Sequence, residues 1–252
     1  MSMEKKVFDL GMYDASDTTY FLEEGFQVIA VEANPSLVAR AQNSLSAYLK
    51  SGQLKIVHSA VGATDAPVEL NVCGDDLGSS SIVENMVAAR NPSGQITVPG
   101  ITMEKLFQQF DVPFYLKIDI EGMDEVCVRS LTPNTRPKYL SFEASNDIEA
   151  LLKFTSSLGY SQYKLINQLN FRNLSNQDNL RERIARKLMR TLGYIEPKYV
   201  RRGDRWFQSA HSSGPGPWCS DGAWTSLDNT LQHWKRAKET KRLWGWYDVH
   251  AT

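Results

Sequence analysis

The stretch FQVIAV at residues 26–31, followed by Glu32-Ala33-Asn34-Pro35, decides the fold. A short run of mostly apolar and β-branched residues is typical of a strand that is covered on both faces. Proline is favoured in the first turn of a helix, and apolar residues recur after it at three- and four-residue steps. The stretch therefore predicts a strand followed by a helix, with an acidic side chain where the strand ends.

The same alternation of strand and helix continues through the first two thirds of the chain. Further strands are predicted at residues 7–10, 55–57, 114–119 and 138–143. Helices are predicted at residues 18–24, at 37–49, after Gly122 and at 147–158. Repeated units of this kind predict an α/β fold, with a mainly parallel sheet and helices on both of its faces. Ligands bind to such sheets at the carboxyl ends of the strands.

Two regions depart from this alternation. Predicted strands at residues 68–72 and 95–98 flank a polar stretch, so we expect an added β-hairpin region at about 68–100. A helical insertion is expected at about 170–203, and it is rich in arginine and lysine. Five of these basic residues, Arg181, Arg183, Arg186, Lys187 and Arg190, share a probable helix. No aromatic side chains alternate with these five charges, as base stacking would require, so a solvated or partner-facing basic helix is favoured over a nucleic-acid site. Both regions are interpreted as parts of a single domain, residues 1–252.

Composition and charge exclude several classes of protein. The 252 residues include 28 basic and 29 acidic side chains, a net charge of -1, which removes the strongest electrostatic argument for a nucleic-acid or membrane partner, and neither is predicted. The three cysteines are far apart in the sequence and odd in number, so they form neither a disulfide framework nor a CxxC metal clip, which indicates a reducing compartment. The N-terminus has no signal-peptide core, and no apolar run is long enough to span a membrane. We therefore expect a cytoplasmic protein.

Acidic residues at the strand ends indicate the ligand. Asp9 closes the first predicted strand, and Gly11 follows it where a side chain would block a ligand from the backbone. Glu32 closes the second strand, where a carboxylate can accept hydrogen bonds from both hydroxyls of a ribose. This pattern favours an adenosine-containing ligand. The alternatives are that Asp9 only caps a turn and that Glu32 is a solvated strand end.

The charge of the loop at residues 11–17, GMYDASD, distinguishes between nucleotides. A dinucleotide site needs glycines that let backbone amides face a pyrophosphate, but this loop has one glycine and two further carboxylates. A pyrophosphate beside Asp9, Asp14 and Asp17 would be electrostatically unfavourable. S-adenosylmethionine carries a sulfonium and an ammonium, with only one carboxylate and no phosphate. The loop therefore favours S-adenosylmethionine over NAD.

Three stretches in this order and spacing resemble the FkbM family of S-adenosylmethionine-dependent methyltransferases. They are DLGMYDASDT at residues 9–18, VEANP at 31–35 and LKIDIEG at 116–122, with SSSI at 79–82 as a fourth, and the likeness spans about residues 5–165. The resemblance implies a class I methyltransferase (Rossmann-like) fold with a seven-stranded, mostly parallel sheet. It also implies methyl transfer, typically to a hydroxyl oxygen of a sugar, polyketide or other secondary metabolite.

We expect five residues of the matching stretches to bind S-adenosylmethionine: Asp9, Gly11, Thr18, Glu32 and Asn34. Two departures from the family pattern DxGANxG lie in the same loop. Tyr13 stands at the position of the asparagine and Ala15 at that of the second glycine, where a methyl group is accommodated if φ is negative. These departures leave open a non-catalytic ligand-binding module of the same fold. A nicotinamide-dependent oxidoreductase is the other open class, although the missing glycines and the carboxylates of the loop disfavour it.

The stretch LKIDIEG also supplies candidates for catalysis. Alternation along a strand puts Lys117, Asp119 and Glu121 on one face. Asp119 is the expected general base or acceptor-orienting residue, because charged neighbours at a strand end can tune its pKa. Alternatively, Lys117 and Asp119 form a structural ion pair, and Glu121 stabilises the start of the next helix. Glu143, at the end of the following strand, is the second catalytic candidate and would bind the acceptor.

The histidines and the C-terminus carry weaker signals. His58 follows the third strand, near the expected adenine, although a loop role is equally compatible. His211 and His250 are interpreted as structural, and because no two histidines have metal-ligand spacing, no metal is predicted. The aromatic residues at 244–250 are expected to pack against the sheet, with an acceptor pocket as the alternative. A small molecule or glycan is the expected acceptor, and the oligomeric state is left open.

Overall fold

The structure is a computed structural model in which the chain divides into two compact units, Met1–Gly159 (unit 1) and Tyr160–Thr252 (unit 2). The described residues are 5–73, 81–82, 92–120, 122–145, 147–176, 184, 188, 191, 198–240, 243 and 245–252. Among the sequence predictions, Glu121, Ser79 and Ser80, Trp244 and most of the helical insertion lie outside these residues. Within the insertion, Ile184, Leu188 and Thr191 are helical.

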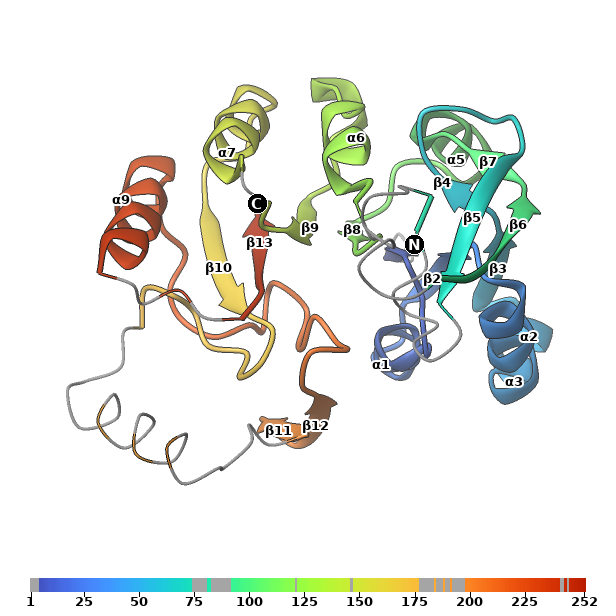
Figure 1. The fold of residues 1–252 in the computed structure, drawn as a ribbon, viewed down its shortest axis with the longest axis horizontal. Helices are drawn as coiled ribbons and strands as arrows, with labels where there is room; N and C mark the ends of the chain where they lie inside the picture. The colour runs from blue at the N-terminus through green and yellow to red at the C-terminus, as the bar shows by residue number, and fades with distance from the viewer. Residues whose placement is uncertain are drawn as a thin grey trace. The chain divides into compact units, whose positions relative to one another are not determined.

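Unit 1 is built from alternating strands and helices (Figure 1). Its strands are β1 (Lys6–Leu10), β2 (Gln27–Glu32), β3 (Leu54–His58), β4 (Ala60–Val61), β5 (Val68–Cys73), β6 (Pro92–Val98), β7 (Gly100–Ile101), β8 (Tyr115–Ile118) and β9 (Tyr139–Glu143). Its helices are α1 (Ser16–Glu23), α2 (Pro35–Ser44), α3 (Ser46–Ser51), α5 (Met103–Phe110), α6 (Asp124–Arg129), the 3-10 turn η3 (Pro133–Thr135) and α7 (Ile148–Ser157).

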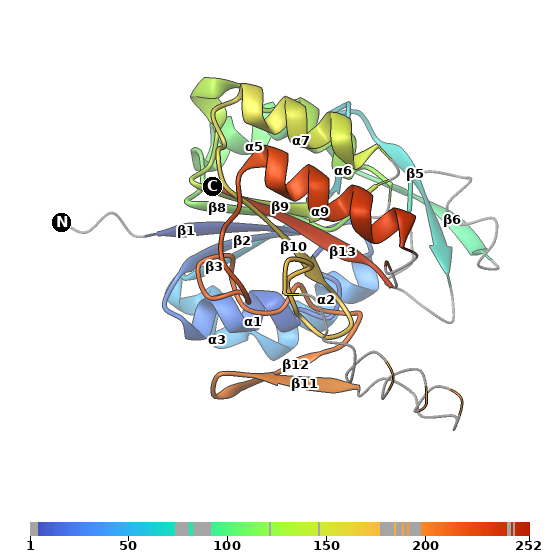
Figure 2. The same ribbon diagram turned by 90° about the vertical axis from the view of Figure 1, so that its left-hand side faces the viewer.

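Five strands of unit 1 pair in parallel, in the order β9-β8-β1-β2-β3. The chain leaves β1 toward β2 and β3, and then returns to place β8 on the other side of β1. This reversal leaves a crevice beyond the carboxyl ends of β1 and β8, where ligands bind to open α/β sheets. Helices α1, α2 and α3 cover one face of the sheet and α5, α6 and α7 cover the other (Figure 2).

The buried strands explain why this sheet forms. Residues 28–31 of β2 are at most 4% exposed, as expected for an apolar run covered on both sides. Asn34 begins α2 by accepting a hydrogen bond from the backbone of Ser36 at 3.0 Å, and Pro35 follows at a position that tolerates proline. The single helix predicted at residues 37–49 is instead two helices. Leu45, with φ -105° and ψ 21°, separates α2 from α3.

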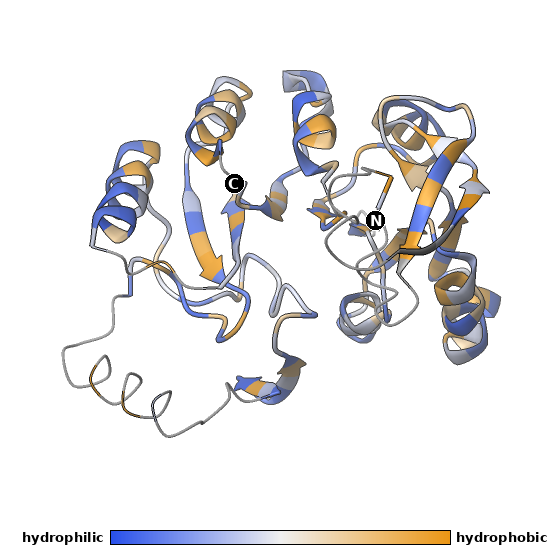
Figure 3. Ribbon diagram, in the orientation of Figure 1, coloured by the Kyte–Doolittle hydropathy of each residue, from blue (hydrophilic) through white to orange (hydrophobic). Residues whose placement is uncertain are grey.

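The pair β5 and β6 lies in the region where the sequence predicts a hairpin, and its strands are antiparallel. Hydrophobic and hydrophilic residues alternate along β5, a pattern visible in Figure 3. Leu70 is 2% exposed and packs with Ala60 and Val98 in a small core of its own. The pair therefore buries one of its faces against the segment that follows β3, and this brings β5 to the edge of the crevice.

Unit 2 has strands β10 (Tyr163–Asn167), β11 (Tyr199–Arg202), β12 (Arg205–Gln208) and β13 (Tyr247–Ala251), and helix α9 (Leu227–Glu239). Strands β10 and β13 are antiparallel, as are β11 and β12. The C-terminal segment that the sequence predicts to pack against the sheet contains β13, which is buried along its whole length. With five strands in unit 1 and two in unit 2, the prediction of an α/β fold with a seven-stranded, mostly parallel sheet is confirmed. The single-domain prediction stays a prediction.

Candidate active site

A buried lysine, Lys117 of β8, is the centre of a charged cluster. Its Nζ atom lies 3.2 Å from Oδ1 of Asp9, 3.4 Å from Oδ2 of Asp17 and 3.2 Å from Oδ2 of Asp119. Burial opposes the charge of Lys117, but these carboxylates outweigh it and raise the pKa of Lys117 well above its ordinary value. With the carboxylates ionised, one cation faces three anions, so the cluster has a surplus of negative charge.

Asp119 is the member of this cluster that reaches solvent. Its side chain is 38% exposed, against 0% for Asp9 and 5% for Asp17. The ion pair between Lys117 and Asp119 that the sequence analysis weighs as an alternative is therefore present. It leaves the carboxylate of Asp119 partly open, so a structural contact and a chemical role are compatible in this residue.

The glycine at residue 11 allows two strand ends to meet. Gly11 has φ +83°, and a Cβ atom built there would lie 1.9 Å from the backbone oxygen of Asp119. The backbone of Asp119 donates to the carbonyl of Leu10 at 2.9 Å, and Gly11 donates to that of Val31 at 3.0 Å. The side chain that Gly11 lacks would thus collide with the chain after β8, a reason that the sequence analysis did not anticipate.

Tyr13 and Ala15, the two departures from the family pattern, both have left-handed backbones, with φ +49° and +64°. Asparagine and glycine adopt this conformation more readily than tyrosine and alanine do. The condition under which Ala15 would be accommodated without strain, a negative φ, is therefore not met. The loop keeps the conformation for which the family's asparagine and glycine are suited, and strain is expected at both positions.

Glu32 connects this loop to the end of β2. Its Oε2 atom accepts a hydrogen bond from the backbone of Tyr13 at 3.0 Å, and Oε1 accepts one from Asn34 at 2.8 Å. Burial raises the pKa of Glu32, the N–H groups of Asn34, Tyr13 and Ala33 oppose the shift, and the charge of Asp9 adds to it. The carboxylate is thus held in one orientation, with lone pairs left for a ligand.

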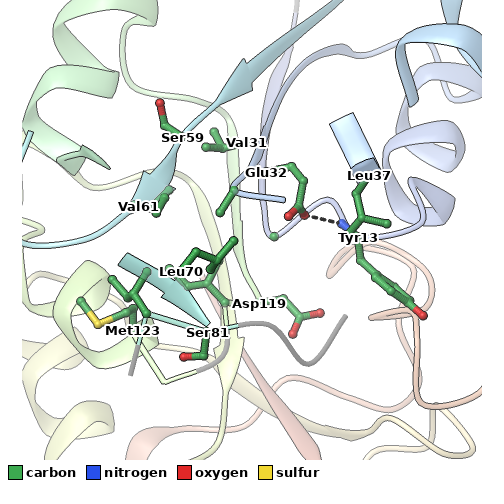
Figure 4. A pocket seen from close by; sticks show the side chains of 15 residues that line it. Tyr13, Val31, Glu32, Leu37, Ser59, Val61, Leu70, Ser81, Asp119 and Met123 are labelled. Atoms are coloured by element: carbon green, nitrogen blue, oxygen red, sulfur yellow. Dashed lines mark hydrogen bonds between the residues drawn. The ribbon is translucent and has the colours of Figure 1, made fainter. Parts of the chain in front are cut away.

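A pocket opens at the carboxyl ends of β1, β2 and β8, with about 570 Å³ of empty space that is partly open to solvent (Figure 4). Glu32 and Asp119 are its acidic lining residues, and Gly11 and Tyr13 belong to its wall. The remaining lining residues are Val31, Ala33, Leu37, Ser59, Ala60, Val61, Leu70, Ser81, Ile82, Ile120 and Met123. The wall is therefore largely apolar, carries two carboxylates and includes no lysine or arginine among the described residues.

Three of the five predicted donor-binding residues do not line this pocket. Asp9 and Thr18 are fully buried, and the hydroxyl of Thr18 donates to Oδ2 of Asp9 at 2.6 Å. Asn34 is 2% exposed and caps α2. The structure thus brings Gly11, Glu32 and Asp119 together at the pocket and puts the other three in the layer behind it.

Asp124, which the sequence analysis missed, joins the ends of β8 and β9. Its Oδ2 atom accepts a hydrogen bond from the backbone N–H of Ile120 at 3.3 Å, and its Oδ1 atom accepts one from the backbone N–H of Glu143 at 3.2 Å. Glu143 lies at the end of β9 as predicted, but it is not among the residues that line the pocket. The acidic first turn of the helix after Gly122 was the signal that could have indicated Asp124.

His58 is exposed and lies outside the pocket wall, with Nε2 3.1 Å from the carbonyl oxygen of Ala33. Within the described part of the chain, no group of three or more histidine, cysteine, aspartate and glutamate residues could hold a metal ion. Nor does any helix there combine the length and apolar character that crossing a bilayer requires.

Comparison with solved structures gives distant likenesses. A precorrin-6y C5,15-methyltransferase from Geobacter metallireducens GS-15 has a TM-score of 0.38 and 13% identity, over 65% of this chain and 67% of the other. The C-terminal domain of the enzyme of that name from Rhodobacter capsulatus has a TM-score of 0.38 and 14% identity, over 65% and 66%. The methyltransferase domain of bacterial CtHen1-CN has a TM-score of 0.34 and 14% identity, over 65% and 80%.

A search of curated proteins finds no significant match. The family model described as "Methyltransferase FkbM domain" matches residues 9–161, which is more than half of the chain and includes every residue of the pocket. Membership favours a methyltransferase over the nicotinamide-dependent oxidoreductase that the sequence leaves open. The chain belongs to the FkbM methyltransferase family and is an S-adenosylmethionine-dependent methyltransferase.

Proposed function

We propose that this enzyme methylates a hydroxyl oxygen of a sugar or other secondary metabolite, and that the pocket at the ends of β1, β2 and β8 holds the methyl donor. The observation that carries the assignment of the donor site is the lining charge. Glu32 and Asp119 are acidic, and none of the described lining residues is a lysine or an arginine. S-adenosylmethionine has a sulfonium and an ammonium and suits such a site, whereas a pyrophosphate does not.

Glu32 and the apolar wall would hold the nucleoside part of the donor. The carboxylate of Glu32 is oriented by two backbone N–H groups and would accept hydrogen bonds from the ribose hydroxyls. Ala33, Leu37 and Val61 supply apolar surface suited to a flat adenine ring. When bound, S-adenosylmethionine supplies the methyl group that the acceptor receives.

Asp119 is the residue that we assign to the acceptor's proton. Its carboxylate lines the pocket, and Lys117 holds it in place at 3.2 Å. A positioned carboxylate can accept the proton of a hydroxyl as the oxygen becomes a nucleophile, or can orient that hydroxyl for in-line transfer. Glu143 lies at the next strand end, where its backbone N–H donates to Asp124, and its carboxylate is proposed to bind a more distant part of the acceptor.

Asp9, Thr18 and Asn34 are proposed to support the donor site from behind. Asp9 and Thr18 bond to one another and connect Lys117 of β8 to the start of α1. Asn34 holds the start of α2, next to the loop in which Glu32 ends β2. Substituting these residues is expected to lower the affinity for the donor by displacing the loops that contact it.

Calorimetry and product analysis test this proposal in turn. Titration with S-adenosylhomocysteine and with NAD compares the two classes of nucleotide, and we expect only the first to bind measurably. Tighter binding of NAD would overturn the assignment of the pocket. Incubation with labelled donor and a panel of sugars and polyketides then identifies the modified atom by mass spectrometry. A methyl group on nitrogen or carbon would overturn O-methylation while leaving the donor site intact.

A further inference from the structure

The parallel ladder between β8 and β9 ends before it reaches the acidic residues that follow it. Its last paired residues are Lys117 and Ser141. Asp119 lies two positions beyond Lys117, and Glu143 lies two positions beyond Ser141. The backbone of Asp119 donates to Leu10 of β1 at 2.9 Å, and β1 is on the opposite side of β8 from β9. The ladder therefore does not fix how far apart the carboxylates of Asp119 and Glu143 lie.

Asp124, the first residue of α6, connects the two strand ends where the ladder no longer pairs them. It is buried, with 9% of its surface exposed. Its Oδ2 atom accepts from the backbone N–H of Ile120, the residue after Asp119, at 3.3 Å, and its Oδ1 atom accepts from that of Glu143 at 3.2 Å. The two oxygens of one carboxylate thus hold both strand ends, so the position of this carboxylate sets the spacing between them.

The Asp124 carboxylate is also bonded to the wall of the pocket. Asp119, Ile120 and Met123 line that wall, and Asp124 follows Met123 directly (Figure 4). The backbone of Met123 donates to the carbonyl of Ile120 at 3.0 Å, which closes a tight turn between the two residues. A displacement of the Asp124 carboxylate would therefore move the backbone next to Asp119, on the side that Leu10 does not hold.

A carboxylate in the first turn of a helix can also serve the helix alone, because negative charge is favourable at a helix N-terminus. Glu125 lies in the same first turn of α6 and supplies that charge too. Its carboxylate pairs with Arg129 at 2.6 Å, and the side chains of the pair are 43% and 41% exposed. Glu125 thus shares its charge and its place in the helix with Asp124, but its ion pair is on the surface, whereas Asp124 bonds to two strand ends.

We propose that Asp124 is a positioning residue for methyl transfer, which fixes the spacing between the carboxylates of Asp119 and Glu143. The inference rests on the proposed function, because that function assigns Asp119 to the proton of the acceptor and Glu143 to a more distant part of it. In-line transfer requires the acceptor oxygen to meet the methyl carbon in a narrow range of geometries, and a misplacement of about 1 Å can cost about 100-fold in rate. Asp124 acts through the two residues that it holds and has no contact with the acceptor in this proposal.

Steady-state kinetics of Asp124→Asn and Glu125→Gln test the proposal, with labelled S-adenosylmethionine and the member of the sugar and polyketide panel that becomes labelled. The amide has one acceptor oxygen, so one buried N–H group loses its partner and one strand end is released. We expect kcat to fall about 10–100-fold and the KM for the acceptor to rise, with the affinity for S-adenosylhomocysteine unchanged. Glu125→Gln removes the same charge from the same turn and should change none of the three values. Equal kinetics in the two variants would overturn the proposal.

A double-mutant cycle separates positioning from a structural role. If Asp124 acts through Asp119, the loss of kcat in Asp124→Asn should largely disappear when Asp119→Asn is already present. Losses that multiply would overturn the proposal, because Asp124 would then act independently of Asp119. A native chain that labels no member of the panel would instead overturn the proposed function.

Circular dichroism and the melting temperature show whether each variant is folded. If Asp124→Asn does not fold, Asp124→Glu takes its place in the same cycle, because it keeps the charge and both acceptor oxygens but moves them by one methylene group. We expect its kcat to fall about tenfold and this loss, too, to disappear in the Asp119→Asn background. An unchanged kcat in Asp124→Glu would overturn the proposal.

Discussion

Two buried lysines, one in each unit, differ in the direction of their pKa shift because the groups around them differ. Lys117 in unit 1 is 2% exposed and faces three carboxylates, which raise its pKa. Lys164 in unit 2 is 3% exposed and donates to the carbonyls of Ser220 at 2.7 Å and Pro217 at 3.3 Å. Burial lowers the pKa of Lys164, and Asp221 and Cys219 only partly oppose this shift. Lys117 is thus a fixed charge that organises a site, and Lys164 is a polar anchor for a loop.

Removing the charge of Asp119 tests whether the Lys117 cluster is catalytic. Asp119→Asn keeps the shape of the side chain but removes its ability to accept a proton. We expect turnover to fall by about 10²–10⁴-fold, with affinity for S-adenosylhomocysteine nearly unchanged. Asp9 and Asp17 still neutralise Lys117 in this variant, so the melting temperature should change little. A large loss of stability with near-normal specific activity would make Asp119 structural.

Replacing each lysine by methionine compares the two surroundings directly. Lys117→Met leaves buried carboxylates without their cation and should cost about 3–5 kcal/mol of unfolding free energy. Lys164→Met leaves only neutral acceptors without a donor and should cost about 1–3 kcal/mol. Urea denaturation of both variants at neutral pH measures the difference. A cost for Lys164→Met as large as that for Lys117→Met would remove the distinction between the two lysines.

Removing the Glu32 carboxylate tests whether the pocket beside the Lys117 cluster binds the methyl donor. Glu32→Ala should weaken binding of S-adenosylhomocysteine by about 1.5–3 kcal/mol, the range for hydrogen bonds to a charged group. His58→Ala is the matched control, because His58 is the last residue of the neighbouring strand β3 and is not part of the pocket wall. Calorimetry on both variants gives the affinities. Unchanged affinity in Glu32→Ala would remove Glu32 from the donor site.

His250, which lies near Lys164, predicts how the stability of the protein depends on pH. His250 is fully buried with Nδ1 3.2 Å from Oγ of Ser220, and burial, followed by the charge of Lys164, lowers its pKa to about 3. In the unfolded chain its pKa is near the ordinary 6.5. The neutral histidine therefore contributes stability that is complete above pH 6.5 and declines as the pH falls toward 3, by about 1.4 kcal/mol per pH unit.

His250→Gln isolates this contribution from that of the carboxylates. Between pH 6.5 and 5, the unfolding free energy of the native chain should fall more steeply than that of the variant, by about 1.4 kcal/mol for each unit. Urea denaturation at several pH values measures both slopes. Parallel slopes would mean that His250 keeps an ordinary pKa in the folded protein.

Local sequence patterns were sufficient to predict the strands of the parallel sheet and the residues at their carboxyl ends. The apolar runs of β1 and β2 and the acidic residues that end them place Glu32 and Gly11 at the crevice. By contrast, β13 includes the buried residues Asp248 and His250, so its sequence does not read as a buried strand. Helix α9 was not predicted because it is predominantly polar, and only Thr230 and Ala237 are buried in it, so few apolar residues mark the face that packs.

Contacts between residues that are far apart in the sequence could not be predicted, because they depend on the tertiary structure. The bonds of Asp17 to Lys117 and of Asp124 to the ends of β8 and β9 depend on how loops are folded. The backbone angles of Tyr13 and Ala15 belong to the same category, because the same residues adopt a negative φ in most loops. The loop conformation is set by its surroundings, namely the carbonyl of Asp119 against Gly11 and the carboxylate of Glu32 on the backbone of Tyr13.

The smallest expected change in unfolding free energy comes from the left-handed backbone of Ala15. Ala15 has φ +64° immediately before α1, a conformation that costs a non-glycine residue about 1–2 kcal/mol. Ala15→Gly removes this strain, and the greater freedom of glycine in the unfolded chain offsets part of the gain, so we expect a net stabilisation of about 0.5–1 kcal/mol. Ala41→Gly, inside α2, is the matched control and should destabilise by about 1 kcal/mol. Urea denaturation measures both variants, and opposite signs are the required result. If both substitutions destabilise equally, the backbone of Ala15 is not left-handed in solution, and the loop before α1 differs from the family conformation.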